Sequence, residues 1–210
     1  MRTDRKRLAC LAALSLAAVP GLSRTLDFEV TLDDKPIGAH RFTLGGTAQA
    51  RTVRSEAAFA VKLLGLTVYR YRHEASEQWR GDCLAGLQAE TDDDGKTGKV
   101  VAQSAGAALE VAGPAGVLQL PACVMSFAYW HPTMRTQTQL LNAQTGRYEA
   151  VRVQRIGGGT VAVRGQPQAA ERWRIEGPEH PLDVWYTPAG DWVGLDSTVA
   201  GGRQLRYRLR

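Results

Sequence analysis

The chain has few of the residues on which metal and nucleophile chemistry usually depends, with 3 cysteines and 4 histidines among 210 residues. The histidines, His40, His73, His131 and His180, are scattered without the short spacings that are typical of zinc sites. No G-x-S-x-G elbow is present, and Ser126 lies in Val-Met-Ser-Phe-Ala without the glycines that such a turn requires. We therefore expect no metal, no cofactor and no serine hydrolase site.

Two glycine-containing or acidic segments resemble ligand loops only superficially. Thr91–Gly95 resembles part of a calcium loop, but counting from Asp92 the twelfth position is Gln103, where the bidentate glutamate should stand. We interpret this acidic run as a hairpin turn at Asp94-Gly95. Gly157-Gly158-Gly159 stands between two predicted strands and not before a helix, so we predict a turn there and not a phosphate cradle.

The first 23 residues have the pattern of a signal peptide. Four basic residues within Met1–Arg7 precede an apolar run, Leu8–Val19, which ends at Pro20-Gly21. Twelve apolar residues are fewer than the about 20 that span a bilayer, so we expect cleavage and not a membrane anchor. Lipidation at Cys10 is disfavoured because no apolar stretch precedes that cysteine. The sequence thus predicts a soluble, exported protein of the periplasm.

Removal of the predicted signal peptide, or leader, would change the net charge of the chain. The leader holds four basic residues and Asp4, which is +3 of the formal net charge of +5, so the remaining chain carries about +2. This small excess gives little support for a nucleic acid partner, and export argues against one as well. No nucleic acid binding is expected.

Two cysteines, Cys83 and Cys123, remain after cleavage. Oxidising conditions outside the cytoplasm favour a disulfide between them, and two buried free thiols are the alternative. A nucleophile and base pair made of Cys123 and His131 is disfavoured, because the bridge would consume the thiol.

Alternation of apolar and polar residues dominates the chain from Thr25 onward, which predicts β-strands. Strand candidates recur about every 10 to 15 residues with Gly, Pro or Asp between them, and no long helix is indicated. We predict a single all-β domain over residues 24–210, a curved, mostly antiparallel meander that forms a closed barrel or a half-barrel. The predicted strands are 26–33, 37–44, 51–62, 66–79, 83–91, 96–103, 109–111, 117–120, 147–156, 160–164, 169–176, 182–187, 192–199 and 203–210.

Two groups of aromatic residues are candidates for a ligand site. In the predicted strand 66–79, Tyr69, Tyr71 and Trp79 share one face, which we expect to point inward. The segment 121–142 does not alternate, so one or two helical turns are predicted, near a dense group of large side chains. That group is Phe127, Tyr129, Trp130 and His131, for which an ordinary core role is the alternative to ligand binding.

Several motifs are distinctive in the chain after the predicted signal peptide: Trp79 with Gly81-Asp-Cys-Leu84, Leu120–Trp130, Leu140–Gly146, Asp183–Trp192 and Gly201–Tyr207. They resemble an uncharacterised domain-of-unknown-function family of small exported bacterial proteins, for which no activity or catalytic residues are known. More distantly, the C-terminal motifs resemble periplasmic β-clam proteins of the Lol lipoprotein-carrier type, which hold acyl chains against a curved sheet. The second resemblance implies a lipid ligand only by analogy.

Taken together, these features predict a protein that binds a lipid or other apolar molecule without catalysis, in a cavity that the curved sheet encloses. One alternative is an enzyme whose site is assembled by folding. The other is a protein that binds a partner, as yet unknown, during envelope assembly. The sequence does not identify the ligand or the oligomeric state.

Overall fold

A computed structural model describes residues 23–210; the predicted signal peptide lies outside these residues, apart from Ser23. Thirteen antiparallel strands form one sheet in the order β11-β12-β13-β14-β15-β1-β2-β3-β4-β5-β6-β7-β8. The strands are β1 (Arg24–Leu32), β2 (Lys35–Gly46), β3 (Ala50–Leu63), β4 (Leu66–Arg80), β5 (Cys83–Asp93), β6 (Lys96–Ala105), β7 (Ala108–Gly113), β8 (Gly116–Pro121), β11 (Arg152–Val163), β12 (Gln166–Glu176), β13 (Leu182–Tyr186), β14 (Trp192–Val199) and β15 (Arg203–Leu209).

A short hairpin, β9 (Gln139–Leu141) and β10 (Tyr148–Ala150), and two 3-10 turns, η1 (Pro132–Thr136) and η2 (Ala200–Gly202), complete the structure of this part of the chain. The all-β prediction is confirmed. Within residues 23–210, no helix is long and apolar enough to cross a membrane.

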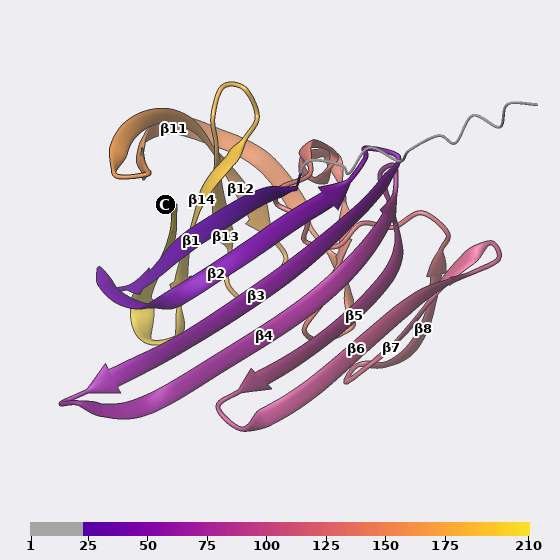
Figure 1. Cartoon of the computed structure of the whole chain (residues 1–210), viewed down its shortest axis with the longest axis horizontal. Coiled ribbons are helices and arrows are strands. Elements are labelled where there is room, and N and C mark those ends of the chain that lie inside the picture. Colours follow the sequence, from indigo (N-terminus) through magenta and orange to yellow (C-terminus); the bar gives the residue numbers. More distant parts are fainter. Residues whose placement is uncertain (1–22) are drawn as a thin grey trace, which may run out of the picture.

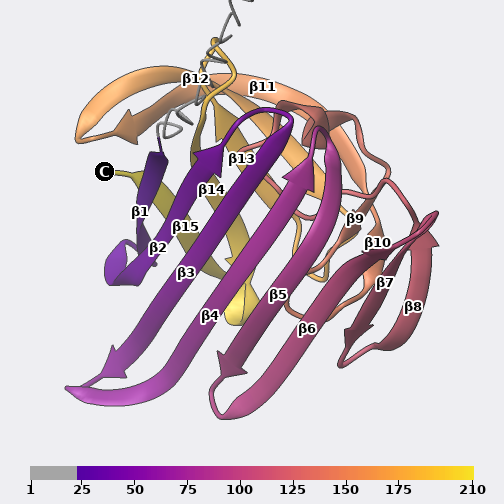
Figure 2. The same cartoon turned by 45° about the vertical axis from the view of Figure 1, so that its right-hand side comes forward.

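The sheet is strongly curved but does not close into a barrel. β1 pairs with β15, so the first and last strands of the domain lie side by side in the middle of the strand order. Strands β1 to β6 form a broad layer, and β11 to β15 curl behind it (Figures 1 and 2). Because β11 and β8 are the two edges of the sheet, the half-open form of the predicted meander is the one observed.

The face of the sheet that turns toward the interior carries the core. Alternate residues of each strand point inward, as Leu26 and Phe28 of β1 and Leu87 and Ala89 of β5 do, and all four are at most 2% exposed. A segment that crosses this inner face, residues 121–151, contributes further buried side chains. Its most deeply buried apolar members are Met125, Ala128, Met134, Leu140 and Leu141.

Two sequence predictions in the second half of the chain are wrong. Gly157–Gly159 is not a turn, because β11 runs through it and pairs these three glycines with Arg172, Glu171 and Ala170. The register shifts at Gly157, and a Cβ on Gly159 would meet the ring of Trp185 at 3.5 Å. The glycines therefore allow a bulge and a close aromatic contact inside a strand.

The predicted strand 147–156 is likewise divided, between β10 and the first part of β11, which pair with different partners. The helical turn expected within 121–142 is present only at η1. It begins at Pro132, a residue favoured at the first helical position, and the Nδ1 atom of His131 accepts a hydrogen bond from the Thr133 backbone N–H at 3.3 Å.

Candidate functional site

The inner face carries a group of aromatic and histidine side chains on strands in the middle of the strand order, which we call the aromatic band. It contains His40 of β2, Phe59 of β3, Tyr69, Tyr71 and His73 of β4, and Tyr207 of β15. His73 is buried, and the other members are half-buried. Strand register brings them together. His40 and His73 flank Ala57 in one row across the sheet, and Phe59 pairs with Tyr71 in the next row.

Ring contacts join the members of the band. The rings of Phe59 and Tyr71 are stacked with centroids 5.2 Å apart, and Tyr207 meets Phe59 edge-on at 6.1 Å. The His40 ring lies 5.7 Å from Tyr207 and stacks on Phe42 at 4.1 Å. These spacings are those of favourable aromatic pairs, so the band is an ordered apolar surface.

Both histidines of the band are held neutral. Burial lowers the pKa of His40 to about 3, with a further contribution from His73, and burial lowers the pKa of His73 to about 4. His40 Nε2 lies 2.7 Å from Ser55 Oγ, and His73 Nδ1 lies 2.8 Å from Thr91 Oγ1. The Nδ1 atom of His40 is inaccessible to water and has no hydrogen-bond partner within residues 23–210.

The tyrosines of the band also remain uncharged. Burial raises the pKa of Tyr71 and of Tyr207, and nearby phenols add to the effect. Tyr69 donates its hydroxyl to Asp93 at 2.7 Å. Among the described residues, the hydroxyls of Tyr71 and Tyr207 have no hydrogen-bond partner, which leaves them available to a ligand.

The segment over the inner face brings a further tyrosine to the band. Tyr129 is half-buried, its ring lies 5.2 Å from that of Trp192, and its phenol is near enough to Tyr71 to raise the pKa of that residue. The backbone carbonyl of Tyr129 accepts a hydrogen bond from the Tyr186 hydroxyl at 2.9 Å, which fixes its position. Phe127 lies beside Tyr129, with ring centroids 6.3 Å apart.

The remaining predicted ligand residues form a second group at the opposite end of β4. The Trp79 ring, which is 2% exposed, meets Trp130 edge-on at 5.3 Å and stacks on His131 at 5.7 Å. The guanidinium of Arg51 lies over the Trp130 ring at 5.2 Å, and Asp82 lies 3.5 Å from His131 Nε2. Unlike any ring of the aromatic band within residues 23–210, the Trp130 ring has a guanidinium stacked on it.

The predicted disulfide between Cys83 and Cys123 is present and adjoins this second group. It joins the start of β5 to the beginning of the segment that crosses the inner face. Next to it, the backbone N–H of Leu84 donates to the carbonyl of Val124 at 2.9 Å. The bridge therefore fixes one end of this segment on the sheet.

Glu77, which the sequence analysis did not single out, lies in the middle of an apolar row of the inner face. Its register neighbours are Val53 on β3 and Leu87 on β5. Ser126 donates its hydroxyl to one carboxylate oxygen at 2.8 Å, and Trp79 Nε1 donates to the other at 2.9 Å. Burial raises the pKa of Glu77, although both hydrogen bonds act in the opposite direction.

Through these hydrogen bonds the Glu77 carboxyl group connects β4, the predicted ligand residue Trp79 and the segment that crosses the inner face. A buried carboxyl with two donors satisfied is costly to disturb, so Glu77 fixes where Ser126 and the neighbouring Phe127 lie. Glu77 lies an even number of residues from Tyr69 and Tyr71 in β4, so alternation places it on the same inner face. This pattern in the sequence could have identified it.

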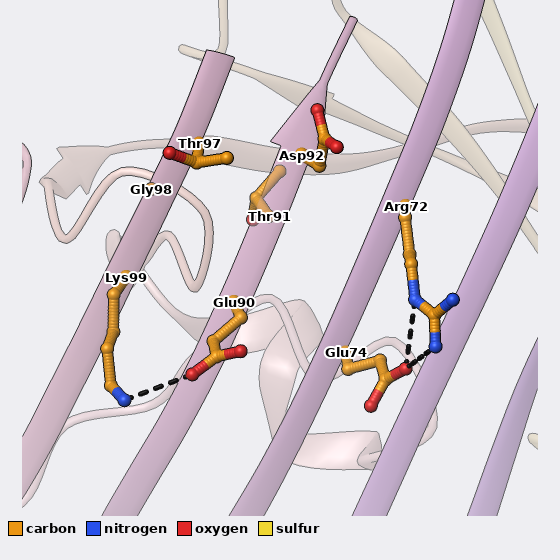
Figure 3. A pocket seen from close by; sticks show the side chains of 8 residues that line it. All are labelled: Arg72, Glu74, Glu90, Thr91, Asp92, Thr97, Gly98 and Lys99. Atoms are coloured by element: carbon orange, nitrogen blue, oxygen red, sulfur yellow. Dashed lines mark hydrogen bonds and ion pairs between the residues drawn. The ribbon is translucent and has the colours of Figure 1, made fainter. Parts of the chain in front are cut away.

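The outer face of the same strands is charged and solvated. A hollow of about 530 Å³ there is lined by side chains of β4, β5 and β6 (Figure 3). Arg72 pairs with Glu74 at 2.5 Å and Lys99 pairs with Glu90 at 3.0 Å, so opposite charges lie side by side. Exposed pairs of this kind contribute little to stability because water screens both charges. None of the predicted ligand residues lines the hollow.

Five of the seven predicted ligand residues fall into two groups, and the other two lie between these groups. Tyr69 and Tyr71 belong to the aromatic band; Trp79, Trp130 and His131 lie near the disulfide; Phe127 and Tyr129 lie between the two groups. The structure adds His40, Phe59, His73 and Tyr207, whose proximity depends on strand pairing. No group of three or more His, Cys, Asp or Glu in residues 23–210 is arranged to hold a metal ion.

The comparisons with known proteins agree with this architecture. The family described as a domain of unknown function, DUF6134, matches residues 28–210. This chain belongs to that family. No curated protein matches it.

Among solved structures, the chain is similar to a β-barrel-like protein of another domain of unknown function, DUF1849, from Brucella abortus. The TM-score is 0.62, and the match covers 92% of this chain and 98% of that chain at 14% sequence identity. Such a distant match supports the fold of this DUF6134 protein and carries no information about its ligand.

Proposed function

We propose that this DUF6134 protein is an exported periplasmic carrier that binds a lipid or other apolar molecule on its aromatic band. The observation that supports the proposal is that several side chains of the aromatic band are only partly buried. Most of the inner face lies beneath the crossing segment, yet Phe59, Tyr71 and Tyr207 remain only half-buried on the same face. An ordered aromatic surface on the inner side of an open sheet is suited to an apolar ligand.

The chemistry of the band narrows the ligand to an amphiphile with an uncharged polar end. The six side chains of the band include no Lys or Arg, and burial lowers the pKa of His40 and of His73 so that both are neutral, so the band itself offers no cation to an anionic headgroup. The hydroxyls of Tyr71 and Tyr207, which have no hydrogen-bond partner among the described residues, supply hydrogen bonds without net charge.

An enzymatic role has one observation in its favour, the contact of 2.7 Å between Ser55 Oγ and His40 Nε2. A serine nucleophile needs a base of suitable pKa and a group that orients it. With a pKa of about 3, His40 is a weak base, and its Nδ1 atom meets no carboxylate within the described chain. These features favour binding over hydrolysis.

The proposal is tested by native mass spectrometry of the protein released from the periplasm of expressing cells under gentle conditions. We expect an adduct of lipid mass that is lost in organic solvent and whose extracted component is uncharged. Exchange of the protein into detergent and back provides the ligand-free control. The proposal would be contradicted if every preparation showed only the mass of the protein without an adduct and if the protein also failed to take up added monoacylglycerol.

A further inference from the structure

A two-stranded ribbon projects from the sheet beside the aromatic band (Figures 1 and 2). β2 pairs with β3 only as far as Phe59, and β5 pairs with β4 only as far as Tyr71. The residues between them, 61–69, therefore pair only with one another and have no neighbouring strand on either side. A ribbon of this kind has little support from the rest of the fold.

The tip of this ribbon is apolar and exposed. Leu63 is 63% exposed, Leu64 is 96% exposed, Leu66 is 73% exposed and Val68 is 53% exposed. Single exposed leucines are common on protein surfaces, but four large apolar side chains within six residues form a continuous patch. Water contact with such a patch is unfavourable in the isolated protein.

The backbone at the tip is also disfavoured. The turn residues Leu64 and Gly65 both have positive φ, 50° and 83°, as a tight two-residue hairpin turn requires. In other hairpins of this chain the position that corresponds to Leu64 holds a polar residue, Asp33, Asp94 or Arg164. A leucine held in the left-handed region and fully exposed indicates that its side chain is needed at that place.

The charges beside the tip are of one sign. Residues 57–73 contain Lys62, Arg70 and Arg72 and no acidic residue. The nearest acids, Asp93 and Asp94, lie at the base of the ribbon, where they bind the Tyr69 hydroxyl and the Arg70 backbone N–H. Leucines flanked by cations match the surface of an anionic bilayer, whose headgroups attract Lys and Arg while the acyl region accepts apolar side chains.

We propose that residues 62–68 dock on the surface of an anionic lipid bilayer, with the leucines inserted and Lys62 and Arg70 at the headgroups. The ribbon places the aromatic band beside that surface, because Phe59 and Tyr71 stack at its base. This inference does not depend on the proposed function. Bilayer docking would stand if the band proved to bind no lipid.

The test is flotation of the protein isolated from cells, with its N-terminus determined by mass spectrometry, on vesicles with roughly 30% phosphatidylglycerol in phosphatidylcholine. The variant Leu63→Ser/Leu64→Asn/Leu66→Ser should lower the partition coefficient by about tenfold or more. Val117→Ser, at an exposed residue of β8, is the matched control and should bind as the parent protein does. Asn suits positive φ, so the melting temperature of the triple variant should not fall.

A second comparison separates lipid from protein partners. Lys62→Ser/Arg70→Ser should reduce binding to anionic vesicles and leave the weak binding to pure phosphatidylcholine unchanged. No flotation of the parent protein, or equal flotation of the triple variant, would overturn the proposal. So would a parent protein that stays off vesicles but forms dimers that the triple variant abolishes, since the ribbon would then be a contact between copies of the chain.

Discussion

The double variant Cys83→Ala/Cys123→Ala should lose about 4 kcal/mol of its free energy of unfolding. The bridge joins residues 40 apart in sequence, so reduction releases a long loop in the unfolded chain. A typical domain has about 5–15 kcal/mol in total, which makes this loss a large share. Both side chains lie outside the most buried core, so truncation to alanine adds little cavity penalty.

Urea titration followed by tryptophan fluorescence measures this loss, with the parent protein under reducing conditions as the matched control. The double variant and the reduced parent protein should show the same shift of the urea midpoint relative to the oxidised parent protein. The hydrogen bond between Leu84 and Val124 and the contacts of Glu77 remain in the variant, so we expect a native spectrum in the absence of urea. A loss below about 1 kcal/mol would mean that these contacts alone hold the crossing segment in place.

Unfolding should become easier by about 4 kcal/mol between pH 8 and pH 5 because of His40 and His73. Their pKa values are lowered to about 3 and about 4 in the folded protein, whereas an unfolded histidine has a pKa near 6.5. Below pH 6.5 the two histidines bind protons in the unfolded chain but remain unprotonated in the folded protein, so the free energy of unfolding falls as the pH falls. At pH 5 the difference is about 2 kcal/mol for each histidine.

Glu77 acts in the opposite direction, since its raised pKa lets the folded protein take up a proton more readily than the unfolded chain. A comparison with His40→Gln/His73→Gln removes this contribution, because Glu77 is present in both proteins. The double variant should show a flatter dependence of unfolding free energy on pH, and each single variant should remove about half of the slope. Parallel curves for the parent and the double variant would show that the two imidazoles titrate normally.

The strands could be predicted from the sequence because alternation of apolar and polar residues is local information. Tyr69, Tyr71 and Trp79 were assigned to the inner face in this way, and all three lie there. The disulfide was predicted from the two cysteines that remain after the expected cleavage and from the oxidising conditions expected outside the cytoplasm. Gly157–Gly159 was misassigned because a glycine run in a strand that bulges looks the same as a turn until the partner strand is known.

The composition of the aromatic band could not be predicted from the sequence. His40 and His73 were regarded as scattered, since 33 positions separate them, and only the pairing of both with Ala57 places them in one row. Tyr207 reaches Phe59 because β15 pairs with β1, a contact between the two ends of the domain. Register and long-range pairing are properties of the folded sheet, and alternation does not specify them.

The central claim is that the aromatic band binds an apolar ligand, and a pair of variants on one strand tests it most directly. Phe59→Glu places a charge in the band, and Ala58→Glu places the same charge on the exposed outer face of β3. Binding is measured by the fluorescence of N-phenyl-1-naphthylamine, an uncharged apolar probe, with circular dichroism to confirm that both variants are folded. We expect Phe59→Glu to weaken probe binding by about tenfold or more and Ala58→Glu to leave it unchanged, because a buried charge repels an apolar ligand. Equal probe binding by both folded variants would contradict the assignment of the site to the aromatic band.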